Sequence, residues 1–107
     1  MRKIKYDNTV ILFLSDLTDI LIKEEYFSFY ETSVEYMWDL ISFVENKIHT
    51  IPHKHAPPYF AKYGNNLFYI LYNRNRNTTW YILFEKTPYH FLIRHISNNH
   101  VVGKYFE

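Results

Sequence analysis

Two neighbouring segments rich in aromatic and branched aliphatic side chains constrain the fold of this chain more than any other feature. Residues 67–73 and 78–86 have the texture of β-strands, and the "RNRN" between them suits a hairpin loop. Both faces of each strand are apolar in the sequence. Either the chain buries both faces, or it buries one face and presents the other to a ligand or partner.

A third strand is predicted over residues 89–96, after the turn "KTPYH". Strands joined by short turns pair antiparallel, so the three segments predict a meander. One side of the third strand carries Tyr89, Phe91 and Ile93, and the other carries His90, Leu92, Arg94 and Ile96. The second side mixes polar and apolar residues, which favours its exposure.

The first half of the chain has helical spacing instead. A first helix is predicted to begin near Asn8 or Thr9, and a second begins at the capping box "TSVE", residues 32–35, and ends before Pro52. The predicted buried stripe of the first helix is Val10, Phe13, Leu14, Leu17, Ile20 and Leu21. That of the second is Val34, Met37, Trp38, Ile41, Val44 and Ile48.

Two further segments complete the expected fold. Residues 2–6 ("RKIKY") suit a short edge strand whose lysines discourage further pairing, and residues 51–64, with three prolines and a glycine, connect helices to strands. We therefore expect one α+β domain over residues 1–107, with a two-helix hairpin packed on one face of a small antiparallel sheet. The three-stranded meander forms this sheet, with or without the N-terminal edge strand.

Composition excludes several kinds of site. The chain has no cysteine, which excludes disulfides, thiolate nucleophiles and cysteine-bound zinc, and it suits a reducing cytoplasm. No apolar stretch approaches the ~20 residues of a membrane-spanning helix, and no cleavage site follows the N-terminal apolar run. We expect a soluble cytoplasmic protein without membrane contact.

Charge is divided unevenly along the chain. Residues 1–53 carry five Lys/Arg and nine Asp/Glu, whereas residues 54–107 carry seven and two, so their formal charges are −4 and +5. Four of the six histidines also lie in the second part. A basic half of this kind suits a polyanion or an acidic protein partner.

The order of strand, two helices, connector, three meandering strands and polar tail resembles the RelE/ParE superfamily of small bacterial toxins from type II toxin–antitoxin modules. The segments "YGNNLFYILYN", "WYILFEK" and "FLIRHISNNHVVGKYF" carry this resemblance. It implies a toxin neutralised by a cognate acidic antitoxin. One branch of the superfamily cleaves messenger RNA on the ribosome, and another poisons DNA gyrase; neither branch implies a small-molecule cofactor.

The resemblance also implies site residues. Lys62 matches the basic loop residue before the first long strand of the ribonuclease branch, and Tyr105 matches the tail tyrosine. The arginine expected within that strand falls at Tyr69, and the arginine expected after the last strand falls at Asn98 or Asn99. These two departures remove positive charge and keep a non-nuclease toxin, or an inactive binding relative, open as an alternative.

Two histidines could replace the missing groups. His95 and His100 are candidates for acid and base, because imidazole titrates near neutral pH, while Arg94 and Lys62 would stabilise the phosphate. The "SNNH" segment that contains His100 is explained equally well by turn chemistry or by a site at the end of the sheet.

Other polar clusters have simpler explanations. Arg74 and Arg76 of "RNRN" could bind phosphate beside aromatic strands, although a solvated hairpin tip is the favoured interpretation. Three histidines around Pro52 lack the carboxylate or cysteine that would complete a ligand set, so no metal site is predicted.

Overall fold

The computed structural model describes residues 2–23 and 30–106, with side chains described for 2–17 and 34–106. The helices and strands follow in the order β1 (Lys3–Tyr6), α1 (Asn8–Lys23), α2 (Tyr30–Lys47), β2 (Lys54–His55), 3₁₀ helix η1 (Pro58–Tyr63), β3 (Phe68–Asn73), β4 (Thr79–Lys86), β5 (His90–Asn98), α3 (Asn99–Val102) and 3₁₀ helix η2 (Gly103–Tyr105). The predicted α+β class is confirmed, as is the order of the main elements.

The sheet has five strands in the order β1-β5-β4-β3-β2. Strands β3, β4 and β5 form the predicted antiparallel meander. The prediction of a wholly antiparallel sheet is wrong, because β1 pairs parallel with β5, from Lys3 opposite His90 to Tyr6 opposite Ile93. Strand β2 was not predicted, since its two residues are too few to show an alternating pattern.

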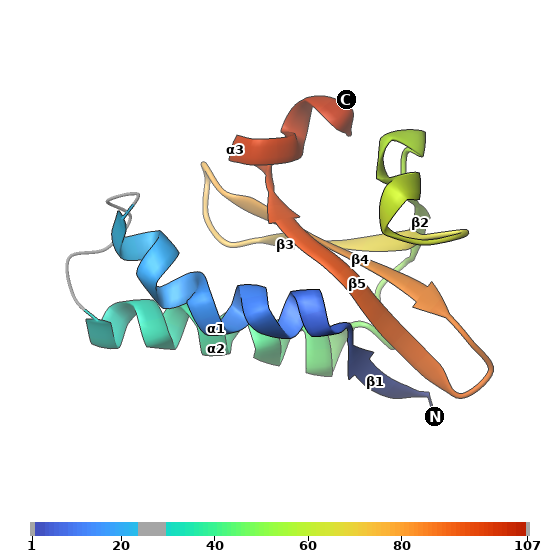
Figure 1. The fold of residues 1–107 in the computed structure, drawn as a ribbon, viewed down its shortest axis with the longest axis horizontal. Helices are drawn as coiled ribbons and strands as arrows, with labels where there is room; N and C mark the ends of the chain where they lie inside the picture. Colours follow the sequence, from blue (N-terminus) through green and yellow to red (C-terminus); the bar gives the residue numbers. More distant parts are fainter. Residues whose placement is uncertain (1, 24–29, 107) are drawn as a thin grey trace.

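Helices α1 and α2 cover one face of the sheet (Figure 1). The buried side chains between them come from both helices and from β3, β4 and β5, and they include Leu14, Val44, Ile70, Ile82, Phe84, Ile93 and Trp80. Trp80 is buried with its indole nitrogen donating to the hydroxyl of Tyr36 at 2.8 Å. The indole N–H is the only hydrogen-bond donor of the Trp80 side chain, and it has a partner although the ring is buried.

The helices differ from their prediction in two details. α2 already includes Tyr30, so Thr32 lies inside the helix and not at its cap, and the last predicted turn is a separate hydrogen-bonded turn after Lys47. The buried stripe of α2 is Tyr36, Leu40, Val44 and Ile48, whereas Trp38 is 57% exposed. Trp38 was misplaced because Tyr36 takes the inward position, where Trp80 supplies a partner for its hydroxyl. The side chains of Ile20 and Leu21 lie outside the described residues.

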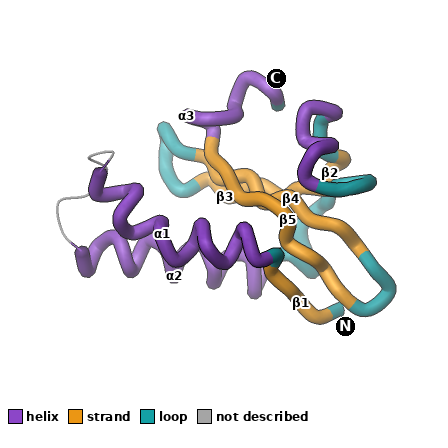
Figure 2. The backbone as a smooth tube through the Cα atoms, viewed as in Figure 1, coloured by secondary structure: helices purple, strands orange, loops and turns teal. Residues whose placement is uncertain are grey.

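The opposite face of the sheet is covered by the chain's own connector and tail. η1 and the α3–η2 segment lie on the side away from the two long helices (Figure 2). Phe60 of η1 and Leu83 of β4 are fully buried there, together with Leu67 and Val102. The expectation of an exposed second face is therefore wrong for β3 and β4, whereas His90, Leu92 and Arg94 of β5 are half-buried. Of the two explanations for apolar character on both faces, burial on both sides applies.

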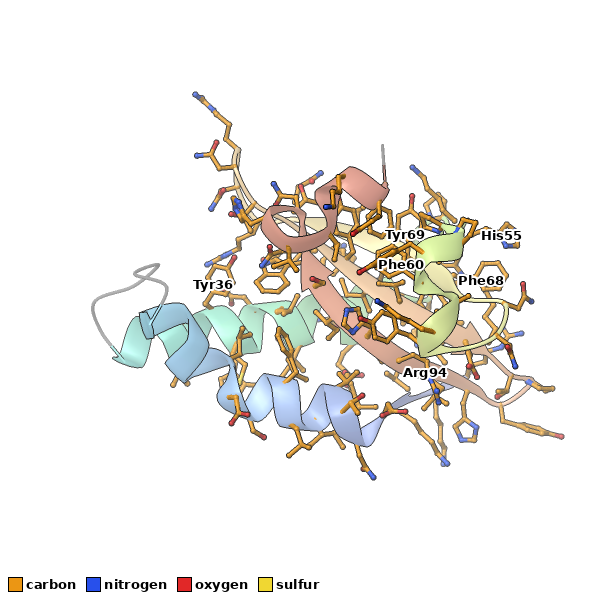
Figure 3. All side chains as sticks on the ribbon, turned by 45° about the horizontal axis from the view of Figure 1, so that its top comes forward. Tyr36, His55, Phe60, Phe68, Tyr69 and Arg94 are labelled. Carbon is orange, nitrogen blue, oxygen red and sulfur yellow. The ribbon has the colours of Figure 1, made fainter. Side chains whose placement is uncertain are left out.

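Aromatic rings complete this second core. Phe106 stacks on Tyr81 with ring centroids 3.9 Å apart and meets Tyr69 edge-on at 4.7 Å. Figure 3 shows Tyr69 near Phe60 on the η1 side, while Tyr36 lies on the helical side. Tyr69 and Tyr81 are thus packing residues first, because they contact each other and both meet Phe106 of the tail.

A β-bulge at Arg94 changes which side chains share a face. Leu83 is opposite His95 and Phe84 is opposite Ile93, so Arg94 is an extra residue in β5. Beyond the bulge the alternation shifts by one. Ile96 therefore joins the helical core, contrary to its predicted side, and His95 pairs with Leu83 on the η1 side.

None of the described helices combines the length and the apolar character needed to cross a membrane.

Phe60→Ala tests whether the second face is a true core. Removing a fully buried phenylalanine should lower the free energy of unfolding by about 3–5 kcal/mol, measured by urea denaturation. Leu12→Ala is the matched control, because Leu12 is 63% exposed and its loss should cost less than about 0.5 kcal/mol. Equal effects of the two substitutions would contradict a buried second core.

Candidate functional site

The short helix η1 places three side chains at the rim of the second core. Pro58 occupies its first turn, and the buried Phe60 anchors it to the sheet. A 3₁₀ helix has about three residues per turn, so side chains three apart lie above one another. Tyr59 and Lys62 have this spacing, and the Lys62 ammonium donates to the Tyr59 hydroxyl at 3.2 Å.

The C-terminal tail brings a second tyrosine and a second lysine to the same place. Tyr105 stacks on Tyr59 with ring centroids 3.5 Å apart and planes 7° from parallel. The Lys104 ammonium lies 5.1 Å from the Tyr105 ring centre, and that of Lys62 lies 4.2 Å from the Tyr59 ring centre. We call Tyr59, Lys62, Lys104 and Tyr105 the tyrosine–lysine cluster. Two cations beside two aromatic rings make it an electropositive aromatic surface.

Proton affinities within the cluster are shifted. The hydrogen bond from Lys62 lowers the pKa of Tyr59 below its usual value, and Tyr105 adds to the effect. The same hydrogen bond raises the pKa of Lys62. Tyr59 therefore gives up its proton more readily than an ordinary tyrosine, while Lys62 keeps its charge.

His95 lies beside the cluster, directly under η1. Its ring stacks on Tyr63 with centroids 3.9 Å apart. Burial lowers the pKa of His95, and the nearby charge of Lys62 lowers it further. Both effects favour the neutral imidazole, the form that can accept a proton. A cavity of about 290 Å³ opens next to it, lined by Thr9, Val10, Phe13, Tyr63, His95 and Ile96.

Arg94 holds this arrangement in place. Its Nε donates to the Tyr63 carbonyl at 2.7 Å, and its Nη1 pairs with Asp7 at 3.2 Å, while Glu85 lies 3.8 Å from its Nε. Figure 3 labels Arg94 on β5. The guanidinium ties η1, β4 and the start of α1 together. Its geometry is that of a positioning residue, since two carboxylates already surround its charge.

The polar segment after β5 is engaged in capping. The Asn98 side chain accepts from the backbone amide of His100 at the start of α3, and Asn99 bonds the backbone of Thr79 and Asn77. The imidazole Nε2 of His100 lies 3.2 Å from the Thr78 hydroxyl. These bonds fasten α3 to the β3–β4 hairpin, so turn chemistry explains the asparagines. His100 is thereby held at the hairpin, whereas Lys62, His95 and Tyr105 are grouped around η1.

The arginines of the hairpin loop differ from each other. Arg74 pairs with Asp39 at 3.2 Å and lies 4.6 Å above the Tyr36 ring, so it fastens the hairpin to α2. Arg76 is exposed at the loop, as expected for a solvated tip. Tyr69, which stands where the ribonuclease branch has an arginine, packs against the second core.

Sequence reasoning missed Tyr59, Tyr63 and Lys104. The available signal was the Tyr59–Lys62 spacing after two prolines, in a segment interpreted only as a connector. Which ring Tyr105 would meet could not be read from local pattern, because Tyr59 and Tyr105 are 46 positions apart in the sequence. Within the described residues, no group of three or more His, Cys, Asp or Glu side chains could hold a metal ion.

Comparison of the chain with protein-family models, with curated proteins and with solved structures found no match.

The lowered pKa of His95 predicts a pH dependence of stability. Because the folded state disfavours protonation, this contribution is fully present above the unfolded pKa, about 6.5, and is lost as pH falls through that value towards the folded pKa. Urea unfolding of the wild type should therefore weaken below about pH 6.5 more steeply than that of His95→Gln. An NMR titration placing the His95 imidazole at or above about 6.5 would contradict the assignment.

Proposed function

We propose that this protein is a RelE/ParE-type toxin that binds and cleaves RNA at the tyrosine–lysine cluster. The observation that carries the proposal is the grouping of Lys62 and Tyr105 with Tyr59, beside His95. Two of these residues match positions that the resemblance assigns to the ribonuclease branch. They come from η1 and η2, which only the fold brings together.

The chemistry requires a base, an anion-stabilising group and an acid. In the proposed reaction the phenolate form of Tyr59, stabilised by the ammonium of Lys62, accepts the proton of a ribose 2′-hydroxyl, whose oxygen forms a bond to the adjacent phosphorus. Lys62 stabilises the anionic phosphorane, and Tyr105 gives a proton to the leaving 5′-oxygen as its bond to phosphorus breaks. The products are a 2′,3′-cyclic phosphate and a 5′-hydroxyl. His95 is a second group that could accept a proton, and the charge of Lys62 lowers its pKa.

The arrangement of the chain supports the toxin proposal at the level of fold. The observed order of one strand, two helices, connector, meander and tail is the order on which the resemblance rests. We propose an acidic antitoxin as partner, supported by the formal charge of +5 on residues 54–107. Because the second face of the sheet is covered, the antitoxin would bind the outer surface of η1 and the tail rather than β3 and β4.

A non-nuclease toxin, such as a gyrase inhibitor, is the second candidate. Tyr69 is packed in the second core, and Asn98 and Asn99 are engaged in capping and in backbone contacts, where the ribonuclease branch has arginines. Uncharged residues at these positions cannot stabilise the anionic phosphorane, which favours a toxin that binds its target without cleaving RNA. The two candidates differ in one observable, which is the appearance of new RNA ends.

Lys62→Gln and Tyr59→Phe should each lower the RNA cleavage rate by about 100-fold or more, because each removes one group of the reaction. The measurement is single-turnover cleavage of messenger RNA, with and without ribosomes, followed by mapping of the ends. Lys47→Gln is the matched control for charge, since Lys47 lies exposed in the last turn of α2. Intact RNA with the wild-type protein, alongside arrested growth, would reject cleavage and favour the second candidate.

A further inference from the structure

A hollow at the end of the sheet where β1 meets the β4–β5 turn is unused by the proposed reaction. It has a volume of about 560 Å³ and is lined by Arg2, Lys3, Pro88, Tyr89 and His90. None of these lining residues is acidic. The hollow therefore gathers two permanent cations and an exposed phenol ring, the groups that bind phosphate and stack on bases.

The two cations are available for a ligand. The guanidinium of Arg2 is oriented by a 2.7 Å bond from its Nε to the Thr87 carbonyl and lies 5.4 Å from the Phe91 ring centre. Lys3 is exposed. Neither side chain forms an ion pair with any residue in the described part of the chain. Binding a phosphate here would break no internal salt bridge.

The backbone of the turn that carries Tyr89 is braced by hydrogen bonds. The Thr87 amide donates to the His90 carbonyl at 2.9 Å, the His90 amide donates to the Thr87 hydroxyl at 2.9 Å, and Pro88 restricts the backbone between them. Tyr89 is 75% exposed at this turn. An aromatic ring held out on a braced turn loses little entropy when a base stacks on it.

The hollow is lined from both sides of the sheet. Arg2 lies over Phe91 of the helical core, whereas Lys3 points to the side of the tyrosine–lysine cluster. Ile4 and Tyr6 of β1 pack on the helical core, so alternation sends Lys3 and Lys5 to the opposite face, where η1 lies. Lys5 is exposed between the hollow and the rest of that face. Positive side chains thus continue from the hollow along the β1 edge.

We propose that Arg2, Lys3, Tyr89 and His90 bind a single-stranded segment of RNA outside the cleaved bond. The inference rests on the proposed function, because it names a second contact for the same strand. Arg2 and Lys3 would hold phosphates and Tyr89 would stack on a base. Sequence is not read by such a site, since every base offers a face for stacking.

An acidic peptide fits this surface less well than RNA. The lysines of β1 disfavour addition of a peptide strand to this edge. A peptide would also need an enclosed apolar pocket for an anchoring side chain, whereas this hollow is open and its lining is divided between polar and apolar atoms. Duplex RNA would leave Tyr89 without an accessible base.

The test is fluorescence anisotropy with a labelled 2′-O-methyl oligouridylate of about twelve nucleotides, which lacks the attacking hydroxyl and reports binding without cleavage. Tyr89→Ala should weaken binding by about 5-fold or more, from ~1–3 kcal/mol per stacked base. Arg2→Gln with Lys3→Gln should lower the slope of log affinity against log salt by about 1.4, at ~0.7 per phosphate contact. Trp38→Ala and Lys47→Gln, on the exposed side of α2, should leave both quantities unchanged.

Three results would overturn the inference. The first is that the Tyr89 and Arg2/Lys3 variants bind the single-stranded oligonucleotide as tightly as the wild-type protein. The others are equal affinity for a duplex of the same length, and tighter binding of polyglutamate that depends on the same residues. The cleavage assay is separate. RNA binding that depends on Tyr89, in a protein that cuts nothing, would retain this site and reject the proposed nuclease. RNA cleavage by the wild-type protein, with binding that does not change in Tyr89→Ala, would retain the proposed nuclease and reject this site.

Discussion

The structure depends on β4 being buried on both of its faces. Trp80, Ile82 and Phe84 point into the core beneath α1 and α2, and Leu83 points into the core beneath η1 and the tail. A central strand with no polar side available to solvent requires a cover on each side, because exposed apolar area costs roughly 25 cal/mol per Å². The two long helices supply one cover. The second cover comes from segments that follow these helices in the chain, which are η1 and the C-terminal tail.

That requirement places the candidate site. The covering segments, η1 and the α3–η2 tail, are short, and the buried residues Phe60 of η1 and Val102 of α3 anchor them to the sheet. Their other side chains, Tyr59, Lys62 and Lys104, consequently lie at the outer rim. Phe60 and Val102 close the second core and also bring the lysines and tyrosines of their segments together. The proposed chemistry therefore depends on the packing of this core. The bulge at Arg94 contributes to both, since it turns His95 towards η1 and fixes the Tyr63 carbonyl.

Charge and aromatic rings recur at both proposed RNA contacts. In each, cations lie beside tyrosines, and in each a short rigid element presents the ring: η1 for Tyr59 and the Thr87–His90 turn for Tyr89. Arg74 and Arg94, by contrast, are paired with carboxylates and serve the fold. Arg74 and Arg94 are thus structural, whereas Lys62, Lys104, Arg2 and Lys3 remain for a ligand.

The sequence by itself determined the elements that local pattern encodes. Helical spacing marked α1 and α2, and alternation with β-formers marked β3, β4 and β5, because these signals depend on neighbours within one turn or one pleat. It also identified Lys62, His95 and Tyr105 as candidates. Tertiary structure alone decided the parallel pairing of β1, the bulge at Arg94 and the meeting of η1 with the tail. Those features depend on contacts between distant residues, and a local pattern carries no information about which distant partner each residue will meet.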